Sequence, residues 1–216
     1  GSDEVIAFVG KGVEFKGALT ATNEAEVQAG AGVTAQQTVT SGSLIIAAGQ
    51  AARFNGALTV TNHAEVRAGG GVTAEQVVTT GSLFVQAGQS VEFKSTVTVS
   101  DLADVRGGGG VTAQQAVTTG SLFVQAGQAV EFNGALRVTN HAEVRAGSGV
   151  TAQQAVTTGS LFLDAGQGAE FKSPLTVLGN ADIRAGLGIT VRDVISAGGL
   201  GLQAGQAIDL FANITV

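Results

Sequence analysis

A 39-residue internal repeat limits the possible folds of this 216-residue chain more than any other feature. Phenylalanine recurs in register once per copy, and leucine takes the next place at the end of the chain. A fainter period divides each copy into units of 19 and 20 residues. Periods of this length are typical of solenoid repeats, in which each unit packs only against its neighbours. The phenylalanine series is Phe15, Phe54, Phe93, Phe132 and Phe171, followed by Leu210.

Each unit contains three short stretches in which apolar and polar residues alternate, for example 58–60, 64–68 and 72–74. Alternation with a period of two indicates β-strands, and no segment fits a helical pattern. Glycine, asparagine or aspartate separates the stretches, where we expect sharp corners or a positive φ. Strands this short gain stability by pairing with their equivalents one turn before and after.

The pattern predicts an all-β fold, a right-handed parallel β-helix (β-solenoid) with about eleven coils of 19–20 residues, where a coil is one turn of the solenoid. We expect the right-handed form because left-handed hexapeptide helices need a strict six-residue period, which units of 19 and 20 residues do not keep.

The expected core alternates a large and a small side chain at one inward position of successive coils, as in Phe54, Ala74 and Phe93. Large over small lets the layers interdigitate, whereas a ring at every level would overpack a narrow interior. This alternation explains why the period spans two coils. We therefore predict a core ladder of Phe15, Phe54, Phe93, Phe132 and Phe171.

The composition excludes several functional classes. Only 13% of the residues are charged and the net charge is −6, so nothing concentrates positive charge for a nucleic acid. The absence of cysteine excludes disulfides, thiolate metal sites and cysteine nucleophiles. Neither a run of about 18 apolar residues nor a signal-peptide pattern is present, so we expect no membrane insertion by this segment.

The chain is interpreted as one repeat domain over residues 3–216, preceded by Gly1 and Ser2, which are typical of a cloning scar. Residues 3–15 match the second half of a repeat, and the chain stops just inside a new coil. Solenoids need polar caps to protect their terminal edges, and neither end carries a capping sequence. We therefore expect a segment of a longer array.

The repeat motifs resemble those of a known family. The unit GSLFVQAGQSVEF (81–93) and the unit ALTVTNHAEVRAG (57–69), with glycine-rich corners and no cysteine, are similar to the haemagglutinin repeats of filamentous haemagglutinin-like exoproteins, over residues 3–216. The resemblance implies a β-helical shaft that a Gram-negative bacterium exports by two-partner secretion. It also implies a secreted or cell-surface location, and use in adhesion or in holding a distal effector domain away from the cell.

The chain departs from the full-length pattern of that family. The Asn-Pro motifs of the family's secretion region are absent, since the only proline, Pro174, follows Ser173. An Arg-Gly-Asp cell-binding tripeptide is absent as well. The secretion function is therefore not assigned to this segment.

Two groups of residues are weighed as candidates for chemistry. His63 and His141 lie four coils apart, about 19 Å at 4.8 Å per coil, which is too far to share a metal ion. A row of outward carboxylates lies beside arginines, and its repetition lacks the asymmetry that acid/base catalysis needs. Cross-coil ion pairing is the preferred interpretation, so we expect no catalytic residue, no metal and no cofactor. The carboxylates are Glu26, Glu65, Asp104, Glu143 and Asp182.

A row of outward aromatic side chains is the main candidate for a binding surface. Phe84 lies between the inward residues Leu83 and Val85, and Phe123 and Phe162 repeat it. One interpretation is a lateral contact surface for a glycan, a host protein, a neighbouring shaft or a flanking segment. The other is that the rings cover the aliphatic stems of arginines. The candidate stripe consists of Ile45, Phe84, Phe123, Phe162, Arg67, Arg106 and Arg145.

These features favour a non-catalytic structural and adhesive shaft segment of a secreted bacterial adhesin or contact-dependent toxin-delivery exoprotein. The expected partners are host-cell glycans or matrix proteins and flanking parts of the same exoprotein. The alternatives are an inert spacer, an ice-binding solenoid and a carbohydrate-active β-helix. Outward threonines such as Thr59 and Thr61 are typical of ice-binding faces, but Arg137 and Leu178 interrupt the array.

Overall fold

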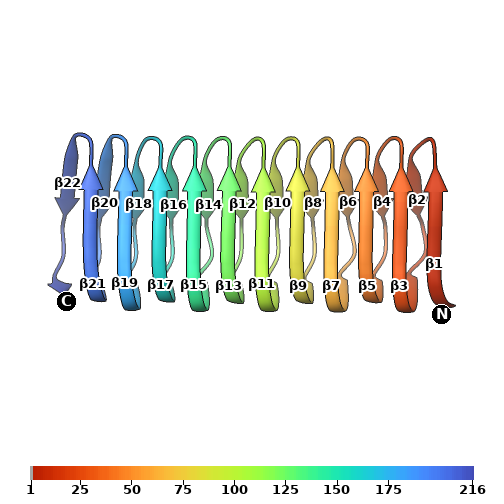
Figure 1. Cartoon of the computed structure of the whole chain (residues 1–216), viewed down its shortest axis with the longest axis horizontal. Coiled ribbons are helices and arrows are strands. Elements are labelled where there is room, and N and C mark those ends of the chain that lie inside the picture. Colours follow the sequence, from red (N-terminus) through yellow and green to blue (C-terminus); the bar gives the residue numbers. More distant parts are fainter. Residues whose placement is uncertain (1) are drawn as a thin grey trace.

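The computed structural model describes residues 2–216 and is an all-β solenoid (Figure 1). A 12-stranded sheet, called sheet A, and an 11-stranded sheet, called sheet B, are both parallel. The described residues contain no helix. Gly1, half of the expected cloning scar, lies outside the described residues, whereas Ser2 begins β1.

Sheet A consists of β1 (Ser2–Val9), β3 (Leu19–Ala29), β5 (Val39–Ala48), β7 (Leu58–Ala68), β9 (Val78–Ala87), β11 (Val97–Gly107), β13 (Val117–Ala126), β15 (Leu136–Ala146), β17 (Val156–Ala165), β19 (Leu175–Ala185), β21 (Ile195–Ala204) and β23 (Ile214–Thr215). Sheet B consists of β2 (Val13–Phe15), β4 (Val33–Ala35), β6 (Ala52–Phe54), β8 (Val72–Ala74), β10 (Val91–Phe93), β12 (Val111–Ala113), β14 (Val130–Phe132), β16 (Val150–Ala152), β18 (Ala169–Phe171), β20 (Gly188–Val191) and β22 (Ala207–Leu210).

The chain winds in a right-handed sense. In Figure 1 the strands of sheet A run upward in front, those of sheet B run downward behind, and the chain advances from right to left. Each strand pairs with the equivalent strand of the coil before and the coil after, so the strand order within each sheet follows the chain. The predicted parallel β-solenoid of about eleven coils is confirmed.

The predicted division of each coil into three short strands is wrong. The first two stretches form one long strand of sheet A, and only the third stretch is a separate strand. A register irregularity joins the two halves of β7: Val60 faces Thr80, but His63 faces Ser82. The strand β7 has 11 residues and β9 has 10. This one-residue bulge makes alternate coils 20 and 19 residues long and produces the 39-residue period.

Glycine is required at two corners of the coil by close backbone approach. No described residue has a positive φ, so the expectation of positive φ at the corners is wrong. A Cβ atom on Gly81 would lie 2.8 Å from the carbonyl oxygen of Thr61 in the preceding coil. A Cβ atom on Gly88 would collide with the carbonyl group of Gly69, and Gly88 is one of ten successive glycines with this contact at the end of sheet A. They are Gly30, Gly49, Gly69, Gly88, Gly108, Gly127, Gly147, Gly166, Gly186 and Gly205.

The interior is filled by alternating large and small side chains. Phe93 is 5% exposed and faces Ala74 in the preceding coil and Ala113 in the following one. Phe15 is only partly buried, because it belongs to the first coil and has a neighbouring coil on one side only. The buried members of the predicted core ladder are Phe54, Phe93, Phe132 and Phe171.

Buried hydroxyl groups occur in the shorter coils. The Thr80 hydroxyl donates a hydrogen bond of 2.8 Å to the carbonyl oxygen of Ser82 at the bend of β9. Thr119 and Thr158 make the equivalent bond in later coils. Burial of a hydroxyl group is costly unless the group is hydrogen-bonded. The carbonyl oxygens at the bend provide the acceptors that these buried threonine hydroxyls require.

Candidate functional site

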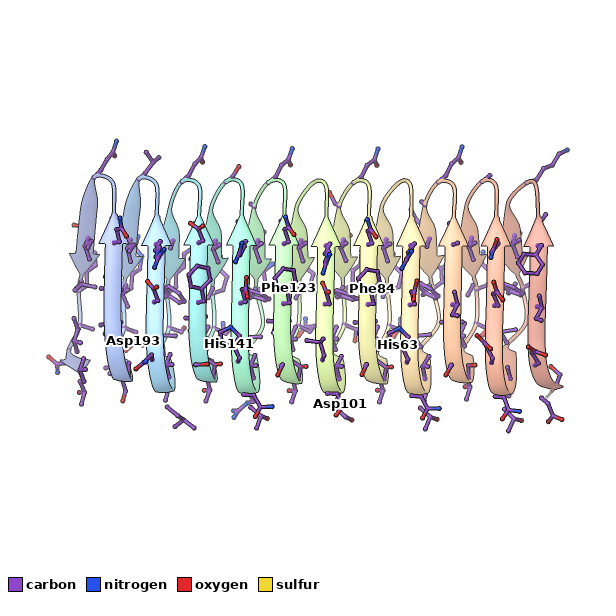
Figure 2. The ribbon with its side chains drawn as sticks, in the orientation of Figure 1. His63, Phe84, Asp101, Phe123, His141 and Asp193 are labelled. Carbon is purple, nitrogen blue, oxygen red and sulfur yellow. The ribbon has the colours of Figure 1, made fainter. Side chains whose placement is uncertain are left out.

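The predicted binding residues lie on the outward face of the second half of sheet A. One row of this face alternates aromatic and acidic side chains, because Phe84 faces Glu65 on one neighbouring strand and Asp104 on the other. Phe84 and Phe123 lie on the outer face of the sheet in Figure 2, and both are half-buried. The Phe/Arg stripe is defined as Ile45, Phe84, Phe123, Phe162, Arg67, Arg106 and Arg145.

Arginines of adjacent coils lie over the outward rings. The guanidinium carbon of Arg67 lies 5.4 Å from the centroid of the Phe84 ring, and that of Arg106 lies 5.6 Å from it. Arg106 is also 5.2 Å from the ring centroid of Phe123. These distances fall within the range of cation–π interactions. The structure therefore brings the aromatic and basic members of the stripe together, with the guanidinium groups over the rings.

The arrangement recurs at the C-terminal end of the stripe but not at its start. The ring of Phe162 has the guanidinium groups of Arg145 and Arg184 at 5.5 Å each. Arg184 was not predicted as part of this surface, although its place in the repeat matches that of Arg145. Ile45 occupies the ring position on β5 and faces Glu65. The aromatic part of the stripe therefore begins at β9.

Each arginine of the stripe is ion-paired with a carboxylate of its own strand. Arg67 Nε lies 2.7 Å from Glu65 Oε1. Arg106 donates from Nε and Nη2 to Asp104, at 2.9 and 2.7 Å. The expected cross-coil pairing is therefore wrong for this row. The hydrogen bonds to Asp104 raise the pKa of Arg106 above its ordinary value and keep the group charged. The same pair recurs as Arg145–Glu143 and Arg184–Asp182.

The stripe presents guanidinium groups to solvent, with the ring faces covered. The Arg67 side chain is 59% exposed, and those of Arg106 and Arg145 are about half exposed. Ion pairs this exposed contribute little stability each. A guanidinium group has five N–H donors, so the donors that the carboxylate does not use can bind an external acceptor.

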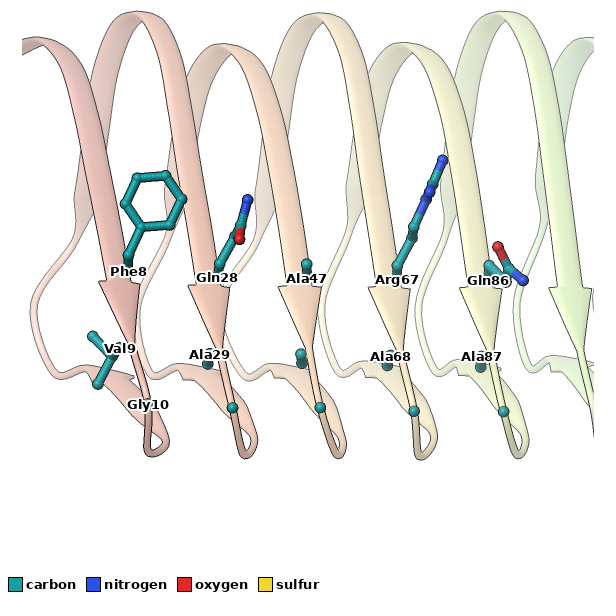
Figure 3. A pocket seen from close by; sticks show the side chains of 15 residues that line it. Phe8, Val9, Gly10, Gln28, Ala29, Ala47, Arg67, Ala68, Gln86 and Ala87 are labelled. Carbon is teal, nitrogen blue, oxygen red and sulfur yellow. The ribbon is translucent and has the colours of Figure 1, made fainter.

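An open groove runs beside the stripe, at the corner where the strands of sheet A end (Figure 3). Its first section has a volume of about 850 Å³ and spans β1 to β9, and a second section of about 440 Å³ spans β9 to β13. Alanine and glycine at the strand ends, such as Ala68 and Gly69, form the floor. Arg67 and Gln86 belong to the side-chain row that lines one side. The groove was not predicted, although the recurring Ala-Gly pair is its signal in the sequence.

The two histidines stay apart, as their spacing predicts. His63 lies on β7 and His141 lies on β15, with three strands of sheet A between them (Figure 2). His141 Nδ1 is 2.9 Å from the hydroxyl oxygen of Ser160, and His63 Nε2 is 3.8 Å from Glu65. Within residues 2–216 no group of three or more His, Cys, Asp or Glu side chains is arranged to hold a metal ion.

The outward face of sheet B carries a different polar pattern. Its single outward row alternates threonine with a charged residue, as where Glu92 faces Thr73 and Thr112. At the following corner, Lys94 donates to Glu75 of the preceding coil at 2.9 Å. This hydrogen bond raises the pKa of Lys94. Cross-coil ion pairing therefore occurs beside sheet B, while the arginines of the stripe pair within their own strands.

The outward threonines of sheet A form a longer ladder than the sequence indicated. Thr40, Thr79 and equivalent residues fill the shorter coils, so that threonines from Thr20 to Thr118 face one another over six strands. Arg137 ends this run on β15. Gly81 occupies the corner that Thr61 occupies in the longer coil, so the ladder is one residue wide there. The ice-binding alternative requires a flat, regular array of threonines in more than one row.

No family model, no curated protein and no solved structure matches this chain. The resemblance to filamentous haemagglutinin-like exoproteins therefore rests on the repeat motifs alone. The structure supports the coarser statement that the chain is a parallel β-solenoid repeat protein. Within the described part of the chain, no helix is long and apolar enough to cross a membrane.

Proposed function

We propose that this chain is a non-catalytic structural and adhesive shaft segment of a large secreted bacterial surface exoprotein, either an adhesin or a contact-dependent toxin-delivery protein. One observation carries the proposal. The same outward arrangement, a ring beneath guanidinium groups beside an ion pair, repeats along a rod with a continuous core. A repeated lateral surface suits a partner that is itself extended or repeated, such as a host glycan or a matrix protein.

The fold suits a shaft. With about eleven coils at roughly 4.8 Å each, the rod is about 50 Å long. Strand pairing runs along the rod axis in both sheets, so neighbouring coils are joined by backbone hydrogen bonds over the whole length. The core forms one cluster that reaches from the first coils to the last. Such a rod can hold an attached domain at a fixed distance.

The carboxylates support a non-catalytic role. Acid/base catalysis needs two titratable groups in different environments. Glu65, Asp104 and Glu143 instead repeat in equivalent surroundings, each ion-paired with the arginine two residues further along its strand. Glu65 also has His63 Nε2 at 3.8 Å, but it keeps the same arginine partner as the other two carboxylates. This equivalence argues against the carbohydrate-active alternative.

An inert spacer is the second candidate, and the covered ring faces favour it. If the arginines serve only to shield the outward rings from water, the stripe has no ligand. The adhesive proposal differs from the spacer in requiring that Phe84, Phe123 and Phe162 contribute to a binding reaction.

The test is binding of the purified, folded chain to a panel of host glycans and matrix proteins. We expect saturable binding that weakens by at least about tenfold in the triple variant Phe84→Ser, Phe123→Ser, Phe162→Ser, because aromatic and arginine side chains dominate binding energy at interfaces. Phe211→Ser is the matched control. This ring is 68% exposed and lies 5.9 Å from the guanidinium of Arg192, but it is outside the stripe.

Loss of binding in the triple variant, with binding retained by the control, would support adhesion by the stripe. Equal binding by the parent and the triple variant would overturn it. If the folded parent chain shows no saturable binding, the inert spacer is the better interpretation.

A further inference from the structure

We propose that the groove at the end of sheet A binds a linear polysaccharide that carries one carboxylate per disaccharide and lies along the axis of the rod. This inference rests on the proposed adhesive function, because it names the ligand class for a groove that borders the Phe/Arg stripe. It adds a site, since most residues that line the groove lie outside the stripe.

The shape of the groove suits an extended, flat polymer. Its two sections share Gln86 and Ala87 and together run from β1 to β13. Beyond the first strand, the floor residues from Ala29 to Gly127 are all alanine or glycine, and the alanine side chains are buried. Glycine is fixed in the floor, because a Cβ atom there would collide with the backbone of the preceding coil. A sugar ring can therefore approach the floor closely along several coils.

The charge of the lining favours an anionic ligand. Among the described residues that line the two sections, Arg67 and Arg106 are the only ionisable ones, although the whole chain has a net charge of −6. Arg106 donates to Asp104 from Nε and Nη2. The Nη1 group of Arg106 takes no part in this ion pair. Guanidinium groups bind carboxylates by charge-assisted hydrogen bonds. The amide of Gln86, between the two arginines, can donate to and accept from sugar hydroxyls.

The spacing of the arginines selects among anionic polymers. Arg67 on β7 and Arg106 on β11 both face Gln86 on β9, so they lie two coils apart, about 10 Å. A polysaccharide with one carboxylate per disaccharide repeats its charge at a comparable interval, because its repeat spans two sugar rings. A nucleic acid carries a phosphate on every nucleotide, and two arginines at this spacing are too few to bind it well.

The row of outward side chains that contains Arg67 and Arg106 loses its positive charge further along the rod. Asp164 lies between Arg145 and Arg184, facing both. Its carboxylate would repel an anionic polymer at β17. We therefore expect the ligand to lie over β1 to β13 and not over β17 to β19. This difference provides a matched pair of arginines for the test.

The test is a calorimetric titration of the full chain with a hyaluronan oligosaccharide that is long enough to span Arg67 and Arg106. We expect saturable binding that weakens as salt is added, because exposed charges are screened. Arg106→Gln should weaken binding by about tenfold, since a hydrogen bond to a charged group contributes more than a neutral one. Arg184→Gln removes the same kind of ion pair and ring contact, and it should change affinity by less than about twofold.

Neutral dextran and poly-glutamate complete the series as a neutral polysaccharide and an acidic peptide. Equal binding of either one, or equal losses in Arg106→Gln and Arg184→Gln, would overturn the assignment of ligand and groove. If hyaluronan does not bind while another glycan binds and is lost in the Phe triple variant, the ligand class is wrong and the adhesive function stands. If nothing in either series binds, both are wrong.

Discussion

Two rows of phenylalanine share the 39-residue period but lie in opposite environments. Phe93 in sheet B points inward and packs between Ala74 and Ala113. Phe84 in sheet A points outward, faces Glu65 and Asp104, and contacts guanidinium groups. Both rows alternate a ring with a different residue in the next coil. The comparison shows that strand parity alone decides whether the same residue builds the core or a surface.

The inward row should be the most sensitive to substitution. Phe93→Ser removes a core ring that no neighbour can replace, and we expect a loss of about 3–5 kcal/mol in the free energy of unfolding, as for large-to-small changes in other cores. Urea denaturation followed by circular dichroism measures this loss. A loss below about 1 kcal/mol would show that the ring is not in the core.

The ten corner glycines at the end of sheet A should be the next most sensitive feature, because each lies against the backbone of the preceding coil. Gly88→Ala places a methyl group against the backbone of Gly69, and we expect a loss of about 1–3 kcal/mol from overpacking. Gly17→Ala is the control, because a Cβ atom there has no neighbour within 4 Å. Thermal unfolding of both variants tests the difference. Equal losses would mean that coil spacing adapts to a methyl group at this corner.

The buried hydroxyls should have a moderate effect. Thr80→Val leaves the carbonyl oxygen of Ser82 without its hydroxyl donor, and we expect a loss of about 1 kcal/mol. Thr79→Val, on the exposed side of the same strand, should change stability by less than about 0.5 kcal/mol. Chemical denaturation of the two variants provides the measurement. If Thr80→Val is as stable as the parent, the hydrogen bond at the bend is not needed.

The outward row should have the smallest effect. Phe84→Ser removes a half-buried ring with its guanidinium contacts, and we expect a loss of about 1 kcal/mol or less, the range of exposed cation–π pairs. In a variant that already carries Phe84→Ser, the additional substitution Arg67→Gln should cause little further loss in the free energy of unfolding. A double-mutant cycle on Phe84 and Arg67 measures the coupling. Coupling above about 2 kcal/mol would place the stripe among the structural contacts of the fold.

The repeat predicted the solenoid, its number of coils and the direction of the side chains, because a period of two along each strand and a period of 39 along the chain leave few packings. The merging of two stretches into one bulged strand was not predictable, because Asn62 indicates a corner when the neighbouring coil is not considered. The reason for glycine at the corners was also missed. It depends on the backbone of the preceding coil, which a single repeat does not reveal.

The candidate site was predictable in part. Parity placed Phe84 on the surface and the repeat placed Arg67 nearby, but the contact of the guanidinium with the ring depends on side-chain torsions. The pairing of Arg106 with Asp104 inside one strand was missed for the same reason. The groove depends on small residues that carry no chemistry of their own, so only the assembled corner reveals it.

The central claim is that the outward rings form a surface on a rod whose stability comes from elsewhere. The most direct measurement is urea unfolding of the triple variant Phe84→Ser, Phe123→Ser, Phe162→Ser beside the single variant Phe93→Ser. The proposed architecture predicts that three outward rings together contribute less to the free energy of unfolding than the one inward ring. A triple variant less stable than Phe93→Ser would contradict it, because the outward rings would then belong to the structural core and would not be free to bind a partner.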